Sequence, residues 1–170
     1  MWQGASGWTR AAAAGLVFRP MTDADLPFFQ QLYASTREDE LAPLDWSDAQ
    51  KTAFLEMQFR AQHSHYRQHF ADMDWLVISR AGAPVGRLYL QRRSAEHDVI
   101  DIAFLPQFRG AGLGTALMRD LLDEAAAAGK AVSIHVEKFN PALRLYQRLG
   151  FCKVEDQGVY DLMRWTAPRR

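Results

Sequence analysis

The sequence has little of several features that commonly indicate a function. It has one cysteine in 170 residues, Cys152, so an internal disulfide is impossible, and its neighbours Phe151 and Val154 predict a small core residue more than a reactive thiol. The 20 basic and 20 acidic side chains cancel, which indicates neither a nucleic-acid nor a membrane partner. No apolar run approaches the roughly 18 residues of a membrane span. A soluble, cytoplasmic protein is expected.

The start of the chain lacks the pattern of a targeting signal. Its alanine block, Ala11 to Ala14, is short and no basic cluster precedes it, so residues 1–14 are predicted to be a loose N-terminal arm. No internal repeat or low-complexity linker divides the remainder. Residues 15–170 are therefore expected to form one domain, a size that buries about two-thirds of the unfolded surface.

Hydrophobic patterns and turn residues predict the order of the elements. Ser47 with Gln50 and Thr22 with Asp25 are capping-box pairs, and each is followed by a helical pattern. The charged segment 36–45 is expected to be an exposed loop. Strands are predicted at 16–20, 75–78, 85–90, 97–105, 131–136, 151–154 and 159–165, and helices at 22–35, 47–70, 112–129 and 140–150.

These elements predict an α+β fold with helices layered on a mixed sheet. The strand-loop-helix-strand order makes strand 131–136 parallel to strand 97–105, whereas the other strands form hairpins. A mostly antiparallel sheet of six or seven strands with about four helices follows. Alternation places Val99, Asp101 and Ala103 on one face of strand 97–105, and Ile100, Ile102 and Phe104 on the other.

Three glycines at alternate positions, Gly110, Gly112 and Gly114, lie between a strand pattern and a helix pattern. Glycine permits backbone angles that a β-carbon forbids, and the amides at the start of a helix near Gly112 would attract an anion. An ATPase phosphate loop needs a lysine after its glycines, and none follows here. A dinucleotide fingerprint needs another glycine spacing, early in a βαβ unit. A pyrophosphate cradle and a glycine-rich turn without a ligand both stay open.

The helix predicted at 47–70 has an unusually hydrogen-bonding surface, rich in Gln, His, Arg and aromatic residues. Phe54, Met57 and Ala61 mark its expected apolar face. His63 and His65 are two residues apart and cannot share a helix face as a metal-binding pair would, so no metal site is expected. This helix is predicted to carry substrate specificity, with a homodimer face as the alternative.

Two motifs resemble those of the GNAT superfamily of acyl-CoA N-acyltransferases. The segment Gln107–Gly112 reads Gln-Phe-Arg-Gly-Ala-Gly and matches the family's central motif of Gln or Arg, two residues, Gly, one residue, then Gly or Ala. The segment Asn140–Phe151 is similar to the family's second cofactor motif. With the opening strand, the resemblance covers the chain from about residue 16 to residue 165.

The resemblance implies acetyl-CoA as co-substrate, bound between two parallel strands that splay apart. Backbone amides of the glycine loop would hold the pyrophosphate. For Asn140 a plain helix cap, and for Arg148 a solvated surface residue, are the alternative roles. The implied cofactor-binding residues are Phe104, Leu105, Gln107, Arg109, Gly110, Ala111, Gly112, Leu113, Gly114, Thr115, Asn140 and Arg148.

Acetyl transfer to an amine needs a base for the nucleophile and a proton for the departing thiolate. The family often has a tyrosine at the position of Tyr146, which implies that this phenol is the general acid; core packing is the ordinary role of such a residue. The base or acceptor contact stays open among Glu38 and Glu40, in the loop between the first two helices, and Asp101 and His135, on the splayed strands. An ordinary salt bridge or hydrogen-bonded core group is the alternative for each.

The resemblance therefore implies an N-acetyltransferase that moves an acetyl group from acetyl-CoA to a primary amine by direct attack in a ternary complex. A small molecule or an amino acid is the expected acceptor. Acetylation of a protein N-terminus or lysine is an alternative, and so is a non-catalytic CoA-binding sensor.

Overall fold

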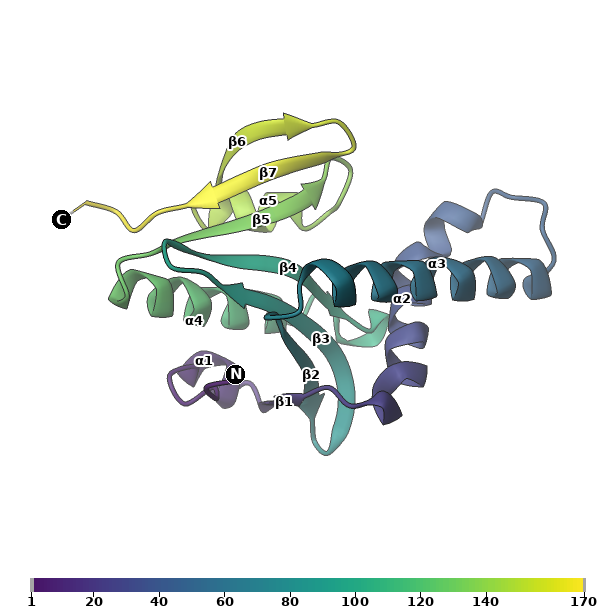
Figure 1. Cartoon of the computed structure of the whole chain (residues 1–170), viewed down its shortest axis with the longest axis horizontal. Coiled ribbons are helices and arrows are strands. Elements are labelled where there is room, and N and C mark those ends of the chain that lie inside the picture. Colours follow the sequence, from purple (N-terminus) through teal and green to yellow (C-terminus); the bar gives the residue numbers. More distant parts are fainter. Residues whose placement is uncertain (1, 170) are drawn as a thin grey trace.

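The computed structural model describes residues 2–169, which form a seven-stranded sheet with helices on both faces (Figure 1). The order of strands across the sheet is β1-β2-β3-β4-β5-β7-β6, and only β4 and β5 pair in parallel. The predicted α+β class and the mostly antiparallel sheet are confirmed. The strands are β1 (Leu16–Pro20), β2 (Asp74–Arg80), β3 (Ala83–Arg92), β4 (Glu96–Phe104), β5 (Ala131–Glu137), β6 (Cys152–Gln157) and β7 (Tyr160–Trp165).

The helices cover the two faces of the sheet separately. Alternation along β2 divides the core, because Leu76 packs with one layer of helices and Val77 with the other. The first layer is α1 (Thr9–Ala13), α4 (Leu113–Ala127) and α5 (Leu143–Arg148), and the second is α2 (Leu26–Leu41) and α3 (Asp48–His69). In Figure 1 α3 continues beyond the sheet at the right. We call the two sides the α4 face and the α3 face.

The parallel pair separates after a few residues. Pairing of β4 with β5 runs from Glu96 opposite Ala131 to Val99 opposite Ile134. Beyond these residues β4 continues to Phe104 and β5 continues to residue 137, and Figure 1 shows the two strands diverging. The two strands do not pair with each other beyond these residues, and we call the opening between them the splay.

A β-bulge at Ile100 changes which face the residues of β4 occupy. Tyr89 of β3 lies opposite Asp101, whereas the next residue, Leu90, lies opposite Val99, so Ile100 is an extra residue in β4. Val99 therefore shares the α4 face with Ile102, while Ile100 packs on the α3 face. The predicted grouping of Val99 with Asp101 is wrong, because one inserted residue reverses the alternation beyond it.

The first two long helices differ from the prediction at their junction. α2 does not end near residue 35 but continues to Leu41, which is buried, so the predicted loop at 36–45 is mostly helical. Charged residues are compatible with the solvent side of a helix, and no glycine or proline interrupts the chain before Pro43. The capping box at Ser47 is confirmed: Gln50 N–H donates to Ser47 Oγ at 3.2 Å, and the reverse bond is 2.8 Å.

The apolar face of α3 is also rotated from the predicted one. Its buried residues are Leu55 and Phe59, whereas Met57 is 60% exposed. Spacing alone gave the wrong face because the helix carries aromatic residues on more than one side. Within residues 2–169 no helix combines the length and the apolar character needed to cross a membrane.

The segment before β1 is packed rather than loose. α1 lies on α4, and Trp8 is only 2% exposed. The buried carboxylate of Asp120 accepts hydrogen bonds from the Ala11 N–H at 2.8 Å and from Arg10, so it caps this short helix from α4. At the other end of the chain Cys152 is exposed on the edge strand β6, where the sequence predicted a core position.

Candidate functional site

The glycine loop joins the end of β4 to the start of α4 with backbone amides that are free to bind an anion. Gly110 and Gly112 have φ values of +74° and +79°, which only glycine adopts without strain. The first intrahelical bond of α4 runs from the Ala116 N–H to the Gly112 carbonyl at 3.0 Å. The amides of residues 113–115 therefore have no intrahelical acceptor, and they add to the positive end of the helix dipole. Ala111 is exposed in the same loop.

Arg109 stabilises this loop through its side chain. Its Nε donates to the Phe104 carbonyl at 2.9 Å, and a terminal nitrogen donates to Ser35 Oγ of α2 at 3.3 Å. Its own N–H donates to the Pro106 carbonyl at 3.2 Å, so the amides left for a ligand begin at Gly110. Gln107 is exposed on a short 3-10 turn, Pro106–Phe108, while Leu105 is buried below it.

The second motif lies beyond the far end of β5. Asn140 Oδ1 accepts the Ala142 N–H at 2.9 Å, so Asn140 caps the turn that leads into α5, which begins at Leu143. The predicted capping role is present, although the helix starts later than the proline suggested. Arg148 is exposed in the last turn of α5.

Tyr146 points from α5 into the core of the α4 face. It is 5% exposed, and its ring meets the ring of Phe151 edge to face at 5.8 Å between centroids. Burial, and then the negative charge of Asp101, raise the pKa of the Tyr146 phenol above its usual value. The phenol is therefore protonated at neutral pH, as a proton donor must be.

Asp101 lies on β4 and His135 on β5, on opposite sides of the splay, and both lie on the α3 face. Asp101 is the second residue beyond the last paired residue of β4, and His135 is the first beyond the last paired residue of β5. His135 alternates with Ile134 and Val136, both of which pack on the α4 face, so its exposed side chain lies on the other side. Asp101 is turned to the α3 face by the bulge, where it contacts Arg87.

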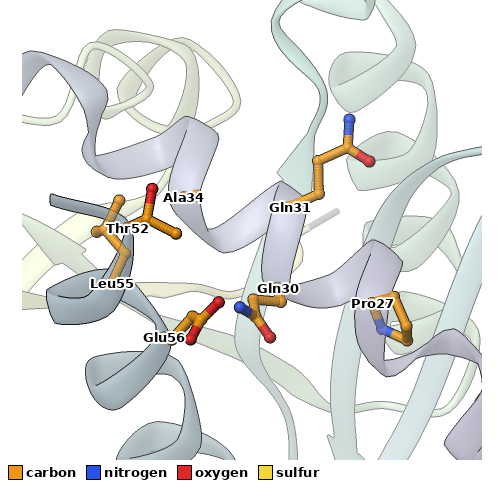
Figure 2. A pocket seen from close by; sticks show the side chains of 7 residues that line it. All are labelled: Pro27, Gln30, Gln31, Ala34, Thr52, Leu55 and Glu56. Carbon is orange, nitrogen blue, oxygen red and sulfur yellow. The ribbon is translucent and has the colours of Figure 1, made fainter. Parts of the chain in front are cut away.

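Glu38 lies apart from these residues. It is exposed on α2, one helical turn beyond Ala34, which lines a hollow of about 340 Å³ between α2 and α3. Figure 2 shows Gln30 and Glu56 pointing toward one another across this hollow. The hollow contains none of the predicted site residues, and we do not assign the active site to it.

Sequence reasoning missed several polar residues of the α3 face. Arg37 of α2 contacts Glu137 at the end of β5 at 3.1 Å, and its guanidinium lies 5.6 Å from the centre of the Tyr33 ring. Arg87 is buried in β3 beside Asp101. A signal for Arg87 was present, because a lone arginine in the apolar run from residue 85 to residue 90 must find a partner.

The arrangement brings two kinds of chemistry to one opening. On the α4 face are a loop with backbone amides that have no intrahelical acceptor and a protonated phenol, and on the α3 face are a carboxylate and an imidazole. The splay joins the two faces, so a thioester held from one side would meet a nucleophile held from the other. No group of three or more potential metal ligands occurs within residues 2–169.

Comparison with known structures identifies proteins that share this fold. The PaiA N-acetyltransferase of Thermoplasma acidophilum, in complex with coenzyme A, has a TM-score of 0.67 at 13% identity, over 89% of this chain and 99% of that chain. YncA of Salmonella typhimurium, with its cofactor acetyl-CoA, has a TM-score of 0.56 at 21% identity, over 92% and 96%. Arabidopsis thaliana Naa50, in complex with the bisubstrate analogue CoA-Ac-MVNAL, has a TM-score of 0.57 at 16% identity, over 90% and 99%.

At these identities the structures share the fold, and the family assignment rests on the sequence. No curated protein matches the chain significantly in sequence. The model of the acetyltransferase (GNAT) family matches residues 30–151, which is most of the chain and includes the glycine loop, both strands of the splay and Tyr146. The protein is a member of the GNAT acetyltransferase family.

Proposed function

We propose that the protein transfers an acetyl group from acetyl-CoA to the primary amine of a small molecule or an amino acid, by direct attack in a ternary complex. The observation that carries this proposal is the splay, which opens the sheet between Tyr146 on one face and Asp101 and His135 on the other. Family membership, and the coenzyme A or acetyl-CoA named in two structural neighbours, support acetyl-CoA as the co-substrate.

The proposed cofactor site runs from the glycine loop to the splay. The amides from Gly110 to Thr115 would hold the pyrophosphate, and the backbone of β4 beyond Val99 would pair with an extended pantetheine in place of β5. Phe104 and Leu105 supply an apolar wall, while Asn140 and Arg148 remain proposed contacts to other parts of the cofactor.

The acceptor has to lose a proton before it can attack. An alkylamine with a pKa near 10.4 is neutral in only about one molecule in 10³ at pH 7, a penalty of about 4 kcal/mol. The carboxylate of Asp101 would attract the ammonium to the splay, and the imidazole of His135 on the opposite side would accept its proton. Glu38 has no step in this scheme, because its exposed side chain lies on the outer side of α2.

The attack then forms a bond between the amine nitrogen and the thioester carbonyl carbon, and the carbon–sulfur bond breaks. A backbone N–H near the end of β4 is the proposed oxyanion donor. Tyr146 would give its phenolic proton to the departing thiolate, and the proton that the attacking nitrogen loses on becoming an amide would return to the phenolate through water. The phenol enters the reaction in its protonated form, and because burial raises its pKa, its efficiency as an acid depends on its placement beside the sulfur.

The test is acetyl-CoA consumption across a panel of primary amines by the wild type and Tyr146→Phe. Loss of a general acid is expected to lower kcat by about 10²- to 10⁴-fold and to leave acetyl-CoA binding and the melting temperature nearly unchanged. Tyr160→Phe, on the partly exposed β7 strand, is the matched control. A Tyr146→Phe enzyme with full kcat would remove the acid role.

A protein N-terminus or lysine is the second candidate acceptor. The observation that favours it is the bisubstrate analogue named for the Naa50 neighbour. Peptides that contain a free α-amine or a single lysine, assayed beside small amines, separate the two candidates by kcat/KM. Tight binding of acetyl-CoA without turnover of any small amine or peptide would instead favour a non-catalytic sensor.

A further inference from the structure

We propose that Arg87 is a positioning residue for the reaction: it holds the carboxylate of Asp101 at the splay with one oxygen directed to the acceptor amine. This inference rests on the proposed function, because the direction of Asp101 matters only if an amine is acetylated beside it.

Arg87 is buried in a place where an arginine is costly. It lies in the middle of β3 with 3% of its side chain exposed. Its guanidinium is 4.7 Å from the centre of the Tyr89 ring and 5.9 Å from that of Phe29. Removing a guanidinium from water is strongly unfavourable unless opposite charge and hydrogen bonds compensate. Arg87 therefore needs its partners in order to stay in the core.

The partners of Arg87 leave half of one carboxylate free. Its Nε and one terminal nitrogen both contact Oδ2 of Asp101 at 2.5 Å. Other N–H groups donate to Gln62 Oε1 at 3.2 Å and to the Tyr89 hydroxyl at 3.3 Å. Because both contacts to Asp101 use Oδ2, its Oδ1 is left for a ligand. The Asp101 side chain is 27% exposed, so the pair has one end in the core and the other at the splay.

The pairing exists because of the bulge in β4. Arg87 lies opposite Ala103, and Tyr89 lies opposite Asp101. Arg87 therefore reaches Asp101 diagonally, from β3 to the neighbouring strand β4. In a regular strand Asp101 would share a face with Val99 and would point to the α4 core. The bulge at Ile100 instead turns Asp101 toward Arg87. A local irregularity next to a functional opening is typical of bulges that redirect a side chain.

Helix α3 contributes to the same arrangement. Gln62 accepts from Arg87, and one turn earlier Gln58 accepts from the Tyr33 hydroxyl at 3.3 Å. The hydrogen-bonding surface of α3 is thus used in part against the sheet. Through Gln62 the helix fixes the guanidinium, and through the guanidinium it fixes the carboxylate.

Other ionisable groups also face Asp101 and must be separated in any pH experiment. They are Tyr89 on β3, Tyr66 on α3 and Tyr146 on α5, all of whose phenols feel the charge of Asp101, with His135 on the opposite side of the splay. Burial raises the pKa of Tyr66 to about 12, and burial also raises those of the other two phenols. The tyrosines therefore stay protonated over the acidic part of a rate profile. Burial, and then the charges of Arg67 and Arg87, lower the pKa of His63 on α3, so His63→Gln and His135→Gln are measured beside the Arg87 variants.

The experiment measures kcat/KM against pH for Arg87→Gln and Arg87→Lys, with Arg80→Gln on β2 as a control away from the splay. Arg87→Gln removes the positive charge, so the acid limb is expected to move up by about 1 pH unit or more and the rate to fall at least about tenfold. Arg87→Lys keeps the charge but not the forked contact, so the rate falls while the limb stays near its wild-type place. Arg80→Gln is expected to change neither.

Combination with Asp101→Asn shows whether Arg87 acts through the carboxylate. In a protein that already carries Asp101→Asn, Arg87→Lys should cause no further loss of kcat/KM. Arg87→Gln should cause no shift of the acid limb of the pH profile in that protein. Fully additive losses, or a loss in Arg87→Gln without a shifted limb, would overturn the inference and leave Arg87 a structural residue. If Arg87→Gln does not fold, Gln62→Leu is used in its place. It is expected to cause a smaller loss of kcat/KM, and no further loss in a protein that already carries Asp101→Asn.

The two proposals can fail separately. A wild-type enzyme that acetylates no amine in the panel overturns the proposed function. A wild-type enzyme that turns over, with Arg87 variants that behave additively, overturns only the role of Arg87.

Discussion

Glu124 offers the sharpest test of how the first residues are attached to the fold. It lies on α4 and receives the Trp8 indole N–H at 2.7 Å and the Arg92 Nε at 2.7 Å. The ring of the buried His97 has its Nε2 at 3.0 Å from the same carboxylate. One carboxylate thus joins α1, the sheet and α4. Its replacement by glutamine keeps the shape and removes the charge.

The size of the effect follows from the pKa of Glu124. Burial would raise this pKa, but the contacts with His97, Arg92 and Trp8 outweigh burial and lower it from 4.5 to about 2. That difference corresponds to at most about 3 kcal/mol of folding free energy, and less in practice because 31% of the side chain is exposed. A depressed carboxyl pKa stabilises the folded protein above the unfolded pKa of 4.5. This contribution is lost as the pH falls from 4.5 to about 2.

Urea unfolding at a series of pH values from 7 to 2.5 measures this contribution. Glu124→Gln is expected to be about 1–3 kcal/mol less stable than the wild type at pH 7, and the difference should shrink toward pH 2.5. Hydrogen bonds from Arg19 lower the pKa of Asp25 to about 2, so protonation of Asp25 also destabilises the folded protein in acid. This loss is the same in the wild type and in Glu124→Gln, and it cancels when their free energies of unfolding are subtracted. Glu155→Gln, on the exposed strand β6, is the control. A difference that stayed constant from pH 7 to pH 2.5 would refute the electrostatic reasoning.

Three further changes test the loop, the sheet and the N-terminal segment. Gly112→Ala meets no atom within 4 Å but imposes a side chain at φ +79°, a strain of about 1–2 kcal/mol, so we expect a raised KM for acetyl-CoA with an unchanged fold by circular dichroism. In Gly86→Ala the new β-carbon would overlap the Ala103 carbonyl oxygen, so a loss of about 1–3 kcal/mol is expected in urea unfolding. Trp8→Ala removes a side chain that is 2% exposed, and a loss of about 3–5 kcal/mol is expected by the same measurement, whereas a loose arm would give no change.

The local signals in the sequence were sufficient for most of the elements. The capping box at Ser47 fixes the start of α3, and that at Thr22 fixes the start of the 3-10 turn Asp23–Asp25 that leads into α2, because their donors and acceptors lie within three residues. The start of α4 at Gly112 and the parallel direction of β5 also followed, since one depends on glycine and the other on chain order. The family motifs then located the glycine loop and Tyr146 in the chain.

Such local signals did not predict how the polar residues are arranged on the α3 face of the splay. The bulge at Ile100 reverses the alternation of β4, and it is defined by pairing with β3 rather than by the residues of β4 alone. Asp101 was therefore a candidate from the sequence, but its orientation, and its pairing with Arg87, were not. The packing of Trp8 on α4 has the same origin, because its partner Glu124 is 116 residues away.

The sequence by itself thus determined most of the elements, their order, the glycine loop and the family, because these depend on short-range preferences and local motifs. The tertiary structure decided which residues share the splay, because facing and burial depend on neighbours that are distant in the chain. The glutamines of α3 illustrate the difference: the sequence marks the helix as unusually rich in hydrogen-bonding residues, and only the contacts of Gln58 with Tyr33 and of Gln62 with Arg87 connect them to the site.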